Sequence, residues 1–127
     1  MDFTCSTRSP GSTQAPIMSE KDIVNAIMRF LKTVPNCIAW KEHGGMYGTA
    51  GLPDIICCIS GRFVAFEVKI PSGKLTKLQE ATIRKILVAG GTAVVVRSVD
   101  EVRAVLEESG IALCKKTLNQ KEKETMQ

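Results

Sequence analysis

The sequence predicts an α/β domain in which a mixed sheet of about four strands is flanked by helices, in the order α-β-β-β-α-β-α. Two apolar runs, 53–59 and 62–70, are separated by Ser60-Gly61, which is a hairpin signal. A valine-rich run, 92–97, lies between two segments that each open with a capping-box pattern. A hairpin followed by a β-α-β crossover requires a mixed sheet with helices on both faces.

The first half of the chain begins with a helix over 19–33. Its apolar residues recur at helical spacing, and Ser19 with Asp22 forms a capping-box pattern. Pro35 and the residue after it end the helix, and 37–41 alternates weakly, as a strand does. Trp40 in this strand is expected in the core. The segment 43–51 holds four glycines and is predicted to be a loop.

The second half continues from the hairpin through a turn at 71–74. Thr76 and Gln79 form a capping-box pattern that opens a helix reaching about residue 89, and Gly90-Gly91 ends it. After the valine strand, Ser98 and Glu101 form another capping-box pattern, which opens a last helix ending near 109–110.

The length of 127 residues suits one domain, which we place at 18–114. Residues 1–17, rich in Ser, Thr, Pro and Gly, are predicted to be a disordered leader, and 115–127 a polar tail. No run is long and apolar enough to span a membrane, and the N-terminus has no signal-peptide core. We therefore expect an intracellular protein, in the cytoplasm of a bacterial or phage-infected cell.

Five cysteines without a CxxC pair, together with a single histidine, argue against a structural zinc site. The net charge of +4 identifies no partner by itself, but five cations and one acid lie between Lys69 and Lys85. This run is either an ordinary solvated helix face or a cationic rim for a phosphate polymer.

The hairpin places two carboxylates side by side. If Ile59 pairs with Arg62, continuing outward sets Asp54 opposite Glu67, whereas a three-residue loop with a bulge would shift this register. Opposed residues have Cβ atoms about 5 Å apart, so the two carboxylates repel each other. Alternation also puts Lys69 on the same strand face as Glu67.

Three arrangements would stabilise such a pair. The carboxylates can share one proton, they can form a structural ion cluster with Lys69, or they can bind a divalent cation. Oxygen ligands without histidine or cysteine favour Mg²⁺ or Mn²⁺. Geometry alone leaves the ion cluster and the cation as equal alternatives.

The residues from Ser19 to about Glu107 resemble the virus-type replication-repair nuclease (VRR-NUC) family of the PD-(D/E)XK nuclease superfamily. The resemblance rests on Pro53-Asp54, twelve residues, then Glu67-Val68-Lys69, and on further matches in the same order, namely Ser19-Glu20-Lys21-Asp22-Ile23, Gly61-Arg62-Phe63, Gly73-Lys74-Leu75-Thr76 with Gln79, Gly90-Gly91, and Ser98-Val99-Asp100-Glu101-Val102. It implies a restriction-endonuclease-like fold and Mg²⁺- or Mn²⁺-dependent cleavage of DNA.

The resemblance also implies roles for individual residues. Asp54 and Glu67 would ligate the metal with the backbone carbonyl of Val68, and Lys69 would position the attacking water or steady phosphate charge. Gln79 would face the site, although it can equally serve only the capping box. Glu20 would reach the metal or its bound water, although an acid also suits a helix start for the dipole alone.

DNA contacts are predicted at Lys74 and Lys77 and in the glycine loop, at His43, Gly44, Gly45 and Tyr47. By analogy with stand-alone members of the family, we expect a homodimeric Holliday-junction resolvase acting on four-way junctions. A nuclease for flaps, nicks or duplex of other specificity is the alternative enzyme. A non-catalytic DNA-binding module is the alternative outside enzymes, and the intact Asp54, Glu67 and Lys69 argue against it.

Overall fold

The protein is seen in a computed structural model that describes residues 18–42 and 50–113. The predicted leader and tail lie outside these residues. The element order is the predicted one: α2 (Glu20–Leu31), β2 (Cys37–Lys41), β3 (Ile55–Ile59), β4 (Arg62–Val68), α3 (Lys77–Val88), β5 (Thr92–Val96) and α4 (Val99–Glu108). The α/β class with a mixed four-stranded sheet is therefore confirmed.

The sheet has the order β2-β3-β4-β5, with antiparallel pairing in the first two pairs and parallel pairing between β4 and β5. Ser60 and Gly61 both have positive φ, which is the two-residue turn that matches strand twist. Ile59 consequently pairs with Arg62, and Ile55 with Phe66. The predicted hairpin register is confirmed.

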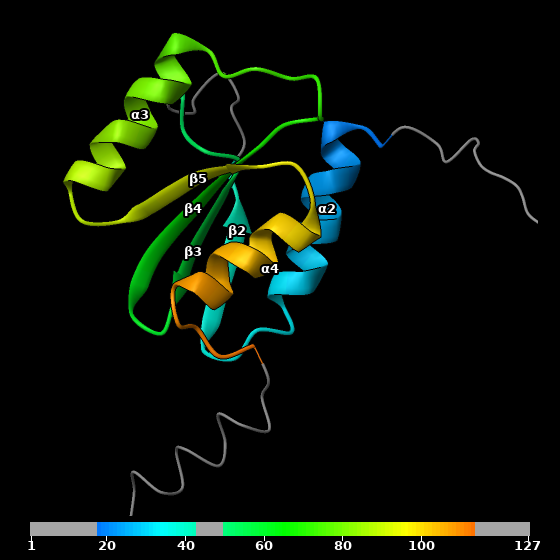
Figure 1. Cartoon of the computed structure of the whole chain (residues 1–127), viewed down its shortest axis with the longest axis vertical. Helices are drawn as coiled ribbons and strands as arrows, with labels where there is room; N and C mark the ends of the chain where they lie inside the picture. Colours follow the sequence, from blue (N-terminus) through cyan, green and yellow to red (C-terminus); the bar gives the residue numbers. More distant parts are fainter. Residues whose placement is uncertain (1–17, 43–49, 114–127) are drawn as a thin grey trace, which may run out of the picture.

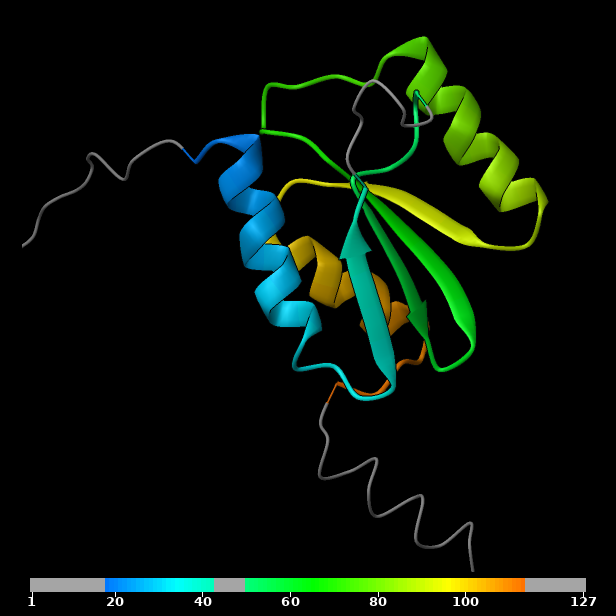
Figure 2. The ribbon, with the colours of Figure 1, turned by 180° about the vertical axis from the view of Figure 1, so that it is seen from behind.

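Helices cover the two faces of the sheet to different extents (Figures 1 and 2). Helices α2 and α4 cover one face, over a core that includes Ile27, Leu106 and Phe66. Helix α3 covers part of the other face, where Ile83 and Ile86 pack on a small cluster. No side chain of α3 is fully buried. The polar link between α3 and the sheet therefore matters for the position of this helix.

Trp40 is not in the core, contrary to the expectation from the sequence. Its side chain is 44% exposed, and its Nε1 donates to Glu42 at 3.1 Å. The physical reason is that β2 is an edge strand, and the cluster under α3 is built on β3, β4 and β5. Alternation directs Trp40 to this lightly covered face.

The capping box predicted at Ser98 is only half formed. The Ser98 side chain accepts from the Glu101 N–H, as predicted, but the Glu101 carboxylate accepts from the N–H of Arg97 at 2.7 Å. The Glu101 carboxylate therefore binds the backbone of Arg97, the residue before the N-cap, and not the backbone of Ser98 itself.

Within 18–42 and 50–113, none of the helices combines the length and apolar character that crossing a bilayer requires.

Candidate active site

Asp54 lies where the β3–β4 ladder ends. The strands are shorter here than predicted, because β3 begins at Ile55 and β4 ends at Val68. Pro53 has no N–H to extend the ladder, and the Asp54 carboxylate accepts from the Val68 N–H at 2.8 Å. A side-chain oxygen thus replaces the next backbone acceptor, and Asp54 is fixed beside the last residues of β4.

Glu67 is the one charged residue in the core of the described chain. It is 2% exposed, and its Oε1 has no hydrogen-bond partner. Burial, and then the negative charge of Asp54, raise the pKa of Glu67 to about 8, while the ammonium of Lys69 opposes this shift. A buried acceptor without a partner is costly, so this oxygen marks a position where a ligand would bind.

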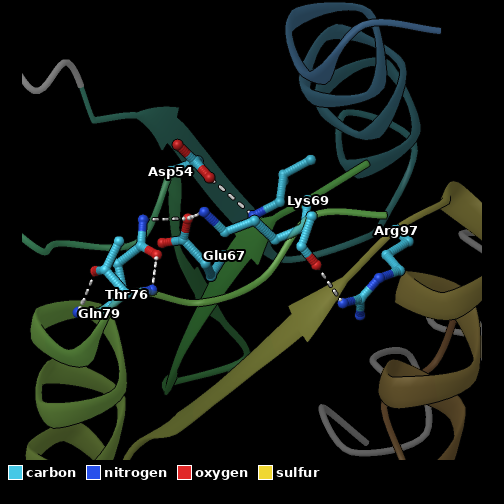
Figure 3. Close-up of polar contacts among 8 residues, drawn as sticks. Asp54, Glu67, Lys69, Thr76, Gln79 and Arg97 are labelled. Atoms are coloured by element: carbon cyan, nitrogen blue, oxygen red, sulfur yellow. Dashed lines mark hydrogen bonds and ion pairs between the residues drawn. The ribbon is translucent and has the colours of Figure 1, made fainter. Parts of the chain in front are cut away.

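The other oxygen of Glu67 is held from two sides (Figure 3). Gln79 donates to Oε2 from Nε2 at 3.0 Å, and the Nζ of Lys69 lies 3.7 Å from the same atom. Lys69 is only 12% exposed, so this ion pair is partly shielded from water. Both contacts leave Oε1 open.

Gln79 serves the helix cap and the site at once. Its Oε1 accepts from the Thr76 N–H at 2.9 Å, and the Thr76 hydroxyl accepts from the Gln79 N–H at 3.1 Å. This capping box uses the amide oxygen, which leaves the amide NH₂ for Glu67. The two roles that the sequence left as alternatives for Gln79 are therefore both present.

The oxygen donors at this end of the sheet suit a divalent cation. Asp54 and Glu67 supply carboxylates. The N–H and C=O of one strand residue face the same neighbouring strand, so we expect the Val68 carbonyl, like the Val68 N–H, on the side of Asp54. Within the described ranges, no three acidic, His or Cys side chains converge as a metal cluster. Two carboxylates, one carbonyl and several waters match the way Mg²⁺ is commonly held.

Glu20 lies close to the site without joining such a cluster. It is the first residue of α2 and, with Asp54, lines a groove of about 430 Å³. Its charge adds a smaller contribution to the raised pKa of Glu67. This placement suits a contact through water better than direct ligation.

The remaining predicted residues divide into two groups. Lys74 and Lys77 are both exposed, before and at the first turn of α3, on the side of the site that holds Gln79. His43, Gly44, Gly45 and Tyr47 lie outside the described residues. Their predicted DNA contacts stay predictions.

Two supporting contacts were not found from the sequence. The Arg97 guanidinium donates to the Gly73 carbonyl at 3.0 Å, which ties β5 to the turn between Lys69 and Gln79. Gly51 packs so closely on α3 that an added Cβ would lie 2.7 Å from Leu78 Cγ. An arginine and a glycine at these positions give no local pattern that predicts either contact.

The comparisons with known proteins concern the fold. No family model matches the sequence, and no curated protein matches it either. A solved structure described as "VRR_NUC domain" matches with a TM-score of 0.59 at 20% identity, covering 69% of this chain and 94% of that one. The resemblance predicted from the sequence is thus confirmed at the level of the fold.

Proposed function

We propose that this chain, which has the fold of a VRR_NUC domain, is a Mg²⁺- or Mn²⁺-dependent DNA endonuclease. The observation that carries the proposal is the buried Glu67 beside Asp54, with one oxygen held and the other open. An ion cluster that only stabilised the fold would not leave a buried carboxylate oxygen without a partner. A cation at this oxygen would satisfy it and offset the repulsion from Asp54.

The proposal also accounts for the raised pKa of Glu67. Without a cation, Glu67 keeps its proton, and the loss of its charge removes the repulsion from Asp54. A cation would displace that proton, because only the carboxylate is a metal ligand. The two arrangements are then two states of one site.

The residues of the chain have distinct tasks in phosphodiester hydrolysis. When bound, the cation would lower the pKa of water and polarise the phosphoryl oxygen. Asp54 and Glu67 would hold it together with the Val68 carbonyl. Gln79 and Lys69 keep Glu67 oriented, and the Lys69 ammonium can stabilise the negative charge that develops on the phosphate.

The finer proposal is a homodimer that resolves four-way junctions. It follows from the analogy with stand-alone family members, and it requires two sites that cut opposed strands. The test is incubation of the full chain with a labelled four-way junction and a linear duplex of the same sequence. Light scattering measures the oligomeric state in the same buffer.

The outcomes separate the levels of the proposal. Paired symmetric cuts in the junction alone, by a dimer, would support the resolvase. Cuts in both DNAs, or a monomer, would keep the nuclease and remove the junction specificity. Binding without cuts in Mg²⁺ and in Mn²⁺ would indicate a non-catalytic DNA-binding module instead.

A further inference from the structure

A groove of about 430 Å³ opens beside the candidate site, on the side away from α3. Asp54 forms part of its wall, so the groove is continuous with the carboxylates that would hold the cation. The opposite wall comes from α2, through Glu20, Lys21 and Asn25. Lys41, the last residue of β2, lines it as well.

Lys41 is held in place from both its backbone and its side chain. Its Cα partner across the sheet is Ile55, and the next residue, Glu42, donates its N–H to the Asp54 carbonyl at 2.8 Å. The Lys41 ammonium donates to the Asn25 amide oxygen at 3.1 Å. Because this acceptor is neutral, the contact orients the ammonium without neutralising its charge.

The charge of the groove depends on the cation. Three carboxylates (Glu20, Glu42 and Asp54) and two ammonium groups (Lys21 and Lys41) line it, which leaves one negative charge in excess. A divalent cation on Asp54 would reverse this to one positive charge. The groove would then attract a polyanion only when the site is loaded.

We infer that this groove binds the phosphodiester backbone of the DNA strand next to the cleaved bond, with Lys41 and Lys21 contacting its phosphates. The inference rests on the proposed function and adds a track for the strand. Lys74 and Lys77 stand by the start of α3, on the other side of the carboxylates. The strand therefore runs from the start of α3, across Glu67 and Asp54, into the groove between α2 and β2.

The experiment measures binding of a labelled linear duplex by fluorescence anisotropy over a range of salt concentrations, with the full chain. Ca²⁺ replaces Mg²⁺, because it also takes oxygen ligands, and a gel checks that the DNA stays intact. The variants are Lys41→Gln and Lys21→Gln. Lys32→Gln is the matched control, because Lys32 is exposed at the opposite end of α2.

Loss of one phosphate contact removes about 0.9 from the slope of log affinity against log salt, which is roughly a tenfold loss of affinity at 0.1 M salt. We expect this for each groove variant and no change for Lys32→Gln. In EDTA, where no cation is bound, the DNA affinities of the groove variants and of the wild type should differ less than in Ca²⁺. Asn25→Ala keeps the charge, so it should weaken binding without changing the slope.

Thermal unfolding of each variant shows whether a weaker affinity reflects a lost contact or a damaged fold. If Lys41→Gln unfolds, Lys41→Arg keeps the charge and should bind as the wild type does. If the wild type cuts DNA and both groove variants bind DNA as tightly as Lys32→Gln, the groove does not bind the DNA strand. The proposed nuclease function is then unaffected. If the wild type neither binds nor cuts DNA, the proposed function and this inference are both wrong.

Discussion

The Gln79 side chain donates to the Glu67 carboxylate at 3.0 Å while its own amide oxygen caps α3 on Thr76. One side chain thus joins a lightly packed helix to the buried acid of the site. Because α3 has no fully buried side chain, this link helps to determine where the helix lies. The stability of the helix start and the position of Glu67 are therefore coupled.

Replacing Gln79 should separate these two roles. Gln79→Glu keeps an oxygen for the Thr76 N–H but replaces the donor to Glu67 with a second acid. The metal-free protein should therefore lose about 1–3 kcal/mol of stability, and divalent-cation affinity should rise, because the site gains a negative charge. Thr76→Ala is the matched variant, because it removes half of the cap and should cost about 1 kcal/mol of stability with a smaller effect on the cation. Isothermal calorimetry and urea unfolding measure the two effects. Equal cation affinity in Gln79→Glu and wild type would contradict the link.

The raised pKa of Glu67 predicts a pH dependence of stability in the metal-free protein. The folded state keeps a proton up to about pH 8, whereas the unfolded chain releases it near its ordinary pKa of 4.5. The stabilising contribution of this proton is complete below pH 4.5 and is lost as the pH rises through 8, because the unfolded chain binds fewer protons in that window. In the wild type, the urea concentration at the unfolding midpoint, measured in EDTA between pH 5 and 9, should fall as the pH rises. Glu67→Gln, which cannot titrate, should show a flatter profile, and an identical profile would refute the assignment.

Binding of Mg²⁺ or Mn²⁺ should release the proton of Glu67. Near pH 7 the uptake of a cation should therefore give calorimetric heats that change with the ionisation enthalpy of the buffer. At a hundredfold excess over Kd, the cation should stabilise the fold by about 2.7 kcal/mol. Asp54→Asn and Glu67→Gln should lose this stabilisation. A cation that raised the Tm of all three proteins equally would be bound elsewhere.

Gly51 should tolerate no side chain, for two separable reasons. Its φ of +85° strains any L residue, and an added Cβ would meet Leu78 Cγ at 2.7 Å. Gly61 has a similar φ of +84° but nothing within 4 Å, so Gly61→Ala reports the backbone strain alone. We expect Gly51→Ala to cost about 1–3 kcal/mol more than Gly61→Ala, as overpacking does. Similar unfolding free energies for both variants would show that α3 moves away at little cost.

The local signals explain why much of the fold could be predicted from the sequence. Ser60-Gly61 set the turn, the turn set the pairing of Ile59 with Arg62, and the register then brought Asp54 beside Glu67. Capping patterns placed the starts of α2 and α3 correctly. These signals are local, and each one is decided by a few neighbouring residues.

The contacts that could not be predicted depend on how elements pack. Trp40 is exposed because α3 does not cover the edge strand, and no local pattern reports the reach of a helix. The Glu101 carboxylate accepts from the N–H of Arg97 and not from that of Ser98, which is the next residue along the chain. The open oxygen of Glu67 depends on the combined positions of Gln79, Lys69 and Asp54, which only the assembled fold determines.

The most direct test of the central claim is cleavage of labelled DNA by the wild type in Mg²⁺, in Mn²⁺ and in EDTA, beside Glu67→Gln and Lys69→Gln. Lys32→Gln again serves as the control. We predict cuts that require the cation, that are lost in Glu67→Gln, that are strongly slowed in Lys69→Gln and that are unchanged in Lys32→Gln. Cleavage that persists in EDTA, or that survives in Glu67→Gln at the wild-type rate, would contradict the claim that this carboxylate holds a catalytic cation.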